Sequence, residues 1–80
     1  MIIASCIVKV EPTQAEEIAA LLNQPPRFTT FGIHKENNLI LVVELEYIKE
    51  MEQTIRNIMD LHTGILAVFP TYMEQEEESV

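Results

Sequence analysis

The chain has 80 residues, with thirteen acidic and five basic side chains and a formal net charge of −8 at pH 7. A chain of this length has room for one compact domain, and 48% hydrophobic with 22% charged residues is typical of a globular one. The negative charge disfavours nucleic acid and anionic membrane surfaces as partners and favours cationic ones.

The first segment, Ile2 to Val10, is rich in β-branched residues and predicts a strand. It has no basic n-region and no cleavage site, so we expect neither a signal peptide nor membrane insertion. We therefore expect the protein to be cytoplasmic. Thr13 stands three residues before Glu16, the spacing of a capping box, which predicts the start of a helix. One face of this helix is apolar, with Ala15, Ile18, Ala19 and Leu22. Pro25 and Pro26 follow and end it.

Phe28 to His34 predicts a second, weaker strand, and Leu39 to Glu46 a third. The polar turn Lys35-Glu36-Asn37-Asn38 lies between them, so the two strands are expected to form a hairpin in which the asparagines tolerate positive φ.

A second helix is predicted from near Tyr47, and Glu52 can pair with Arg56 one turn later. Its apolar residues keep a spacing of three to four: Ile48, Met51, Ile55, Ile58 and Met59. Gly64 ends the connection, and Ile65 to Tyr72 predicts the last strand.

This order of elements predicts an α+β, ferredoxin-like βαββαβ fold, with a four-stranded antiparallel sheet and two helices on one face. The second and fourth strands become the edges, where Pro70 is tolerated. We expect residues 1–73 to form the domain and residues 74–80 to be an acidic disordered tail.

Alternation along the strands predicts which side chains face away from the helices. In the third strand Leu39, Leu41, Val43 and Leu45 form the apolar, covered face. The opposite face carries Ile40, Val42, Glu44 and Glu46, a mixture that favours a binding surface over a solvated one. On the neighbouring strands, we place on the same open side Ser5, Ile7, Lys9, Leu66, Val68 and Tyr72.

Catalytic and metal-binding patterns are missing from the sequence, so we expect no enzyme, no metal and no cofactor. His34 and His62 are far apart and are expected to be solvated surface histidines, and Cys6 an inert buried residue. Two alternatives remain open at this point. One is a small-molecule-sensing regulatory domain of the ACT type, and the other is a dimerisation module that pairs through its edge strands.

Four segments resemble the NapD family, the cytoplasmic chaperones for periplasmic nitrate reductase. They are Ser5-Cys6-Ile7-Val8, Leu22-Asn23-Gln24-Pro25, Asn38-Leu39-Ile40-Leu41-Val42-Val43-Glu44, and the run from Gly64 to Tyr72. The resemblance implies a chaperone that binds the twin-arginine signal peptide of the catalytic subunit of the nitrate reductase. It also implies that binding delays export until the molybdenum cofactor is inserted, and that the peptide lies as a helix on the open sheet face.

The expected signal-peptide-binding residues therefore belong to that face, with apolar side chains for the peptide helix and carboxylates for its arginines. They are Ser5, Ile7, Ile40, Val42, Glu44, Glu46, Leu66, Val68 and Tyr72.

Overall fold

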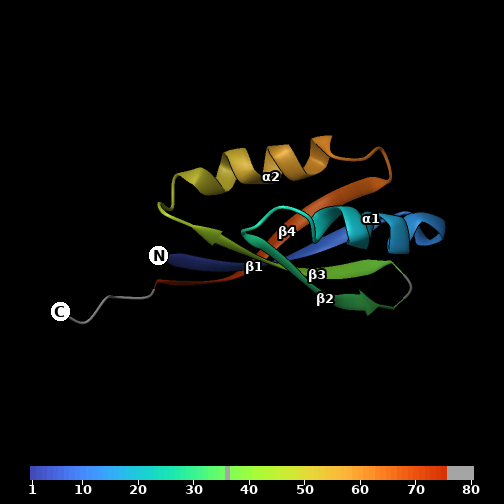
Figure 1. The fold of residues 1–80 in the computed structure, drawn as a ribbon, viewed down its shortest axis with the longest axis horizontal. Coiled ribbons are helices and arrows are strands. Elements are labelled where there is room, and N and C mark those ends of the chain that lie inside the picture. The colour runs from blue at the N-terminus through green and yellow to red at the C-terminus, as the bar shows by residue number, and fades with distance from the viewer. Residues whose placement is uncertain (36, 76–80) are drawn as a thin grey trace.

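The computed structural model describes residues 1–35 and 37–75, which form four strands, two α-helices and one short 3-10 helix (Figure 1). In chain order these are β1 (Ile2–Val10), η1 (Pro12–Gln14), α1 (Ala15–Leu22), β2 (Phe28–His34), β3 (Asn38–Leu45), α2 (Glu50–Asp60) and β4 (Ile65–Gln75).

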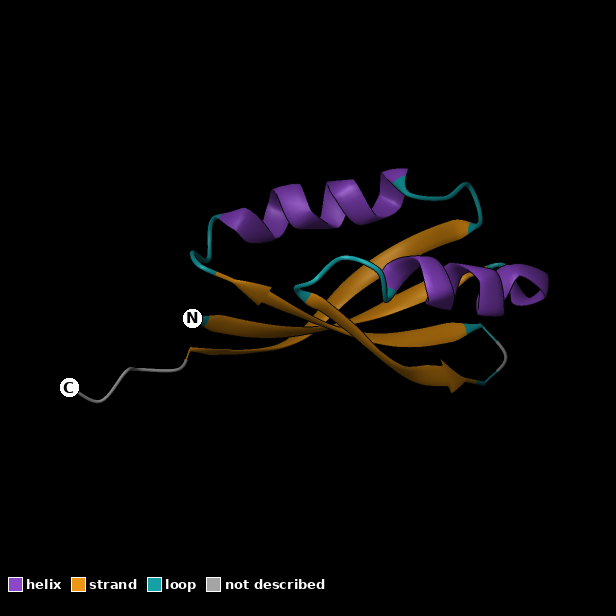
Figure 2. Cartoon of the chain, in the orientation of Figure 1, coloured by secondary structure: helices purple, strands orange, loops and turns teal. Residues whose placement is uncertain are grey.

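The strands form one antiparallel sheet in the order β2-β3-β1-β4, and both helices lie on the same side of it (Figure 2). The predicted ferredoxin-like fold is confirmed, and so is the placing of β2 and β4 at the edges. One face of the sheet is thus covered by helices, while no helix or strand of residues 1–35 and 37–75 covers the other.

The core fills the space between the sheet and the helices. In β1 and β3 every second residue is buried, from Ile2 to Val10 and from Leu39 to Leu45. The helices supply Ala15, Ile18, Leu22, Met51 and Ile58. Because burying one large aliphatic side chain contributes about 1.5–3 kcal/mol, this layer is the main source of stability.

The start of α1 differs from the predicted capping box. Pro12 opens the 3-10 turn, in which the Gln14 amide donates to the Glu11 carbonyl at 2.9 Å, so Thr13 lies inside a turn and lacks the extended backbone of an N-cap residue. Gln14 is the N-cap and makes no side-chain capping bond. The capping-box prediction is therefore wrong, although the buried face of the helix is as expected.

Helix α2 begins at Glu50, three residues later than expected, because the corner before it is held by a side chain. The Glu50 carboxylate accepts hydrogen bonds from the amides of Glu46, at 3.1 Å, and Tyr47, at 2.8 Å. Ile48 consequently lies outside the helix and is exposed, contrary to its predicted place in the apolar stripe. The predicted pair of Arg56 with Glu52 is confirmed at 2.7 Å.

The connection from α2 to β4 is held by His62. We expected this histidine to be solvated, but its side chain is mostly buried. Its Nδ1 accepts from the Gly64 amide at 2.8 Å, and its Nε2 lies 2.5 Å from the Glu17 carboxylate on α1. A Cβ at Gly64 would lie 2.1 Å from Gln14 Oε1, so a larger residue here would require the Gln14 side chain to move. This histidine has a structural role.

Strand β4 contains a bulge that decides which way its side chains face. Ser5 is paired with Tyr72 and Cys6 with Pro70, which leaves Thr71 as the extra residue, and the Thr71 hydroxyl donates to the Ser5 carbonyl at 3.1 Å. Pro70 is tolerated because it lies on an edge strand beside this irregularity.

Beyond the bulge β4 continues to Gln75, past its predicted end at Tyr72. Glu74 and Gln75, which we assigned to an acidic disordered tail over residues 74–80, are thus part of the strand. Residues 76–80 lie outside the described residues, and the boundary between domain and tail stays a prediction.

Candidate functional site

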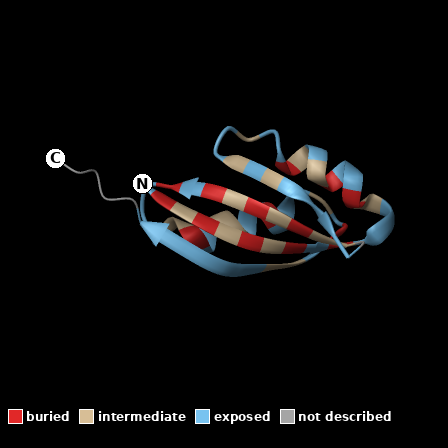
Figure 3. Ribbon diagram, turned by 90° about the horizontal axis from the view of Figure 1, so that it is seen from below, coloured by how far each residue is buried: buried red, intermediate tan, exposed pale blue. Residues whose placement is uncertain are grey.

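The sheet face opposite the helices is the candidate site, and Figure 3 views the molecule from that side. Along β1 and β3, buried residues alternate with partly exposed ones that point to this open face. The predicted outward direction is confirmed for Ser5, Ile7, Ile40, Val42 and Glu44. Lys9, at the end of β1, is likewise exposed.

Strand register arranges the open face in four rows across β3, β1 and β4, because residues paired on adjacent strands point to the same side. We call them the carboxylate row (Glu44, Ile3, Glu74), the central row (Val42, Ser5, Tyr72), the apolar row (Ile40, Ile7, Phe69) and the polar row (Asn38, Lys9, Ala67). The face is therefore acidic at one end, apolar in the middle and carries a lysine at the other end.

On β4 the structure confirms one predicted open-face residue and corrects another. Tyr72 lies opposite Ser5 and is exposed. Val68 lies opposite Val8 and packs against the core, so its placement on the open side is wrong. The bulge at Thr71 is the reason, since an extra residue reverses the alternation on either side of it. Leu66 is exposed at a second irregularity between Lys9 and Val10, and its role stays a prediction.

Two exposed phenylalanines were missed by the sequence interpretation. Phe69 lies opposite Ile7 and is 52% exposed. Phe31, 60% exposed, lies with Gly32 in a bulge of β2 beside Ile40, where Gly32 has a φ of 99°. A proline and a positive-φ glycine inside predicted strands are typical marks of bulges, and they were the available signs. Together these rings extend the apolar middle of the face to both edges.

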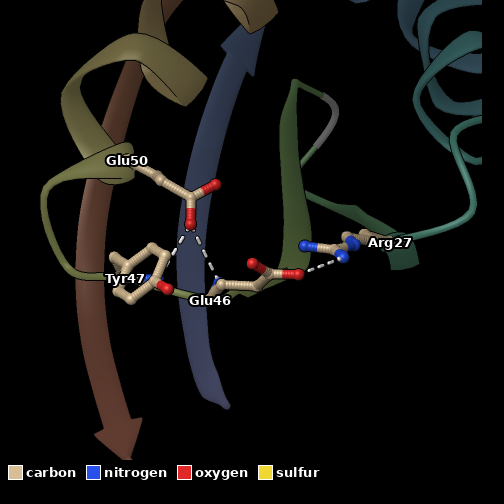
Figure 4. A network of polar contacts seen from close by, with 4 residues as sticks. All are labelled: Arg27, Glu46, Tyr47 and Glu50. Atoms are coloured by element: carbon tan, nitrogen blue, oxygen red, sulfur yellow. Dashed lines mark hydrogen bonds and ion pairs between the residues drawn. The ribbon is translucent and has the colours of Figure 1, made fainter.

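Glu46 lies just beyond β3, at the acidic end of the sheet (Figure 4). Its carboxylate accepts a hydrogen bond from the Arg27 guanidinium at 3.0 Å, and both side chains are exposed. This contact is the main reason that the pKa of Arg27 is raised, with Glu50 and Glu44 contributing through their charge. Glu46 is thus already paired within the chain.

A cavity of about 370 Å³ opens at the same end. Its walls are formed by Met1, Arg27, Glu44, Leu45, Glu46 and Tyr47. The side chain of Glu44 contributes to this cavity and makes no ion pair with any residue in 1–35 or 37–75, which leaves its carboxylate available to a guanidinium from outside.

Neither a metal site nor a membrane span is found in the part of the chain that the structure describes. No group of three or more histidine, cysteine or acidic side chains is placed to hold a metal ion there. Within the same residues, neither helix is long and apolar enough to cross a membrane. Cys6 is fully buried, and burial raises the pKa of its thiol.

Comparison with known proteins gives one family and one informative structure. The family profile described as NapD protein matches residues 1–77. The solution structure of the E. coli Tat proofreading chaperone protein NapD is similar with a TM-score of 0.76 and 29% sequence identity, over 98% of this chain and 82% of that one. No curated protein sequence matches the chain significantly.

Proposed function

The chain belongs to the NapD family and has a chaperone role, and we propose that it acts by binding the twin-arginine signal peptide of the catalytic subunit of a periplasmic nitrate reductase. In this proposal the complex forms in the cytoplasm and delays export until the molybdenum cofactor has been inserted. The family match supports this function over the ACT-type sensor and the dimerisation module.

The observation that carries the proposal is the composition of the open face. Such a peptide combines guanidinium groups with an apolar segment, and the open face combines carboxylates with an apolar middle. We propose that apolar side chains of the peptide pack on Ile7, Ile40 and Phe69, while a guanidinium bonds to Glu44. No reaction at any side chain is required, as expected for a chaperone that is not an enzyme.

The pairing of Glu46 with Arg27 changes how much Glu44 and Glu46 are each expected to contribute to binding the peptide arginines. A guanidinium that reached Glu46 would have to displace Arg27, so little net energy would be gained from the exchange. Glu44 has no such competitor at bonding distance among residues 1–35 and 37–75. We therefore assign the main contact to Glu44 and a weaker one to Glu46.

Most of the affinity should come from a few apolar anchors, while the exposed charges govern encounter rate and salt dependence. Release is part of the function, since the cargo must leave the chaperone before export. Moderate affinity with fast dissociation fits that need better than very tight binding.

Titration calorimetry with a synthetic twin-arginine peptide tests the proposal. We expect binding that weakens as salt rises, and that weakens again when both arginines become lysines, because an ammonium lacks the planar fork that grips a carboxylate. Glu44→Lys should weaken binding by about tenfold or more, the size of one lost charge-assisted hydrogen bond.

Glu16→Lys is the matched control, because Glu16 is exposed on α1 and the same charge change occurs on the opposite side of the sheet. It should alter affinity far less than Glu44→Lys. An affinity that is indifferent to salt, to the lysine exchange and to Glu44 would leave only a generic apolar helix as partner and would refute the twin-arginine assignment.

A further inference from the structure

We propose that the bound peptide lies in one direction on the open face, with its arginine pair on the carboxylate row and its apolar segment running along β1 towards Lys9. The inference rests on the proposed function and adds to it the direction of the peptide and a second arginine-binding carboxylate, Glu74. Neither follows from the presence of an apolar sheet face alone.

The four rows supply the observation. Both outer positions of the carboxylate row are acidic, Glu44 on β3 and Glu74 on β4, with Ile3 between them. Six residues further along β1 the polar row carries Lys9, which is exposed. The open face therefore changes from negative at the carboxylate row to positive at Lys9. A peptide with positive charge at one end meets carboxylates when it lies in one direction and a lysine when it lies in the other.

The direction follows from two electrostatic terms that agree. Arginines placed at the Lys9 end would meet a like charge, whereas at the other end they meet two carboxylates. A peptide helix also carries partial positive charge at its N-terminus and partial negative charge at its C-terminus. With the arginines preceding the apolar segment, the helix N-terminus lies near Glu44 and Glu74, and its C-terminus near Lys9.

The width of the carboxylate row suits two adjacent arginines better than one. Glu44 and Glu74 lie two strand spacings apart, about 10 Å between backbones, with Ile3 below the gap. Consecutive residues on a helix point about 100° apart. Two neighbouring arginines above Ile3 therefore diverge to opposite sides, one towards each carboxylate, which a single arginine cannot do.

The length of the face sets where the apolar side chains of the peptide must lie. From Ile3 to Ile7 is four strand residues, about 13 Å, which a helix covers with about nine residues. From Ile3 to Lys9 is about 20 Å, or about thirteen helical residues. Apolar side chains roughly one to two and a half turns after the arginines should thus contact the central and apolar rows.

Paramagnetic labelling tests the direction. A nitroxide is attached to either end of a synthetic peptide that has adjacent arginines followed by an apolar segment, and amide signals of the full chain are recorded by NMR. We expect the label beside the arginines to broaden the amides of Ile3, Glu44 and Glu74, and the label at the other end to broaden those of Lys9 and Ala67. The reverse pattern, or equal broadening by both labels, would overturn the proposed direction.

A double-mutant cycle tests the second carboxylate. Glu44→Gln and Glu74→Gln are each combined with peptides in which one arginine is replaced by citrulline, its uncharged isostere. We expect each carboxylate to couple with a different arginine, and each single change to weaken binding by about tenfold. Unchanged affinity in Glu74→Gln would overturn the assignment of Glu74.

The two levels of the hypothesis fail in different ways. Absence of any binding refutes the proposed function, and the direction with it. Binding of the expected salt dependence with reversed labels refutes the direction alone, and the proposed function stands.

Discussion

Both faces of the sheet carry aliphatic side chains along β1 and β3, yet only one of the two faces is covered. On the covered face Cys6, Val8 and Leu41 have no exposed surface, because α1 and α2 pack on them. On the open face Ile7 and Ile40 are equally apolar and remain partly exposed. The comparison shows that apolar alternation predicts a covered face only where a second layer is supplied, and that an uncovered apolar face is available for a partner.

Replacing matched residues on the two faces by aspartate should produce the largest contrast. Leu41→Asp buries a charge with no partner in a layer that has no buried polar side chain among the described residues, which costs several kcal/mol. A domain of this size is stable by about 5–10 kcal/mol, so Leu41→Asp should be unfolded or nearly so. Circular dichroism during thermal melting measures this.

Val42→Asp is the adjacent control, and Ile40→Asp a second one. Both side chains face the open side and are only partly buried, so the melting temperature should change little while peptide binding is lost. Equal loss of stability at positions 41 and 42 would mean that the two faces are not distinct.

Alanine substitutions on the edge strand β4 sharpen the comparison, because both alternating positions of this strand are apolar up to Tyr72 and alternation alone does not define its faces. Phe69→Ala removes an exposed ring next to Ile7 and should weaken peptide binding by about 1–2 kcal/mol with little effect on melting. Val68→Ala removes part of a side chain that packs on the core and should lower stability by about 1 kcal/mol, or a few degrees in Tm.

Calorimetry and melting curves on the same two variants separate the roles. If Val68→Ala reduced peptide binding more than Phe69→Ala did, then Val68, and not Phe69, would lie on the open face in solution, contrary to the effect of the bulge at Thr71.

Much of the fold could be predicted from the sequence, because it depends on regular patterns. Strict alternation in Leu39 to Leu45 defines both faces of β3, and the order of strands and helices leaves few topologies. The open-face positions of Ile7, Ile40, Val42 and Glu44 followed from the same alternation. These residues lie in regular, central strands.

The incorrect predictions on the strands occur where the backbone departs from regular pairing. The extra residue at Thr71 places Val68 on the covered face, contrary to its prediction, and the missed Phe69 on the open face, and the bulge at Gly32 contains the exposed Phe31. Pairing of Glu46 with Arg27 joins residues nineteen apart, which no local pattern indicates. Irregular backbone and long-range ion pairs therefore limit prediction of the site more than of the fold.

Moving the thiol from position 6 to position 5 gives the smallest expected effect on the protein, since the double variant should keep the fold nearly unchanged. Cys6 has no exposed surface, and burial raises the pKa of its thiol, so the folded protein should react very slowly with a disulfide reagent at pH 8. In the Ser5→Cys, Cys6→Ala double variant the thiol lies on the open face and should react readily. Bound twin-arginine peptide should then slow the reaction, because Ser5 lies in the central row beneath the proposed helix.

The raised pKa also fixes the expected pH dependence of stability. Above about pH 8.5 the thiol ionises in the unfolded chain but stays protonated in the folded one, so the contribution of Cys6 to stability is complete below that pH and declines above it. Cys6→Ala should remove this alkaline decline while Ser5→Thr, its open-face counterpart, should keep it. Cys6 on the covered face and Ser5 on the open face are adjacent residues of β1. If the thiol at position 6 of the wild type and the thiol at position 5 of the double variant reacted equally fast at pH 8, the two faces would not differ in accessibility.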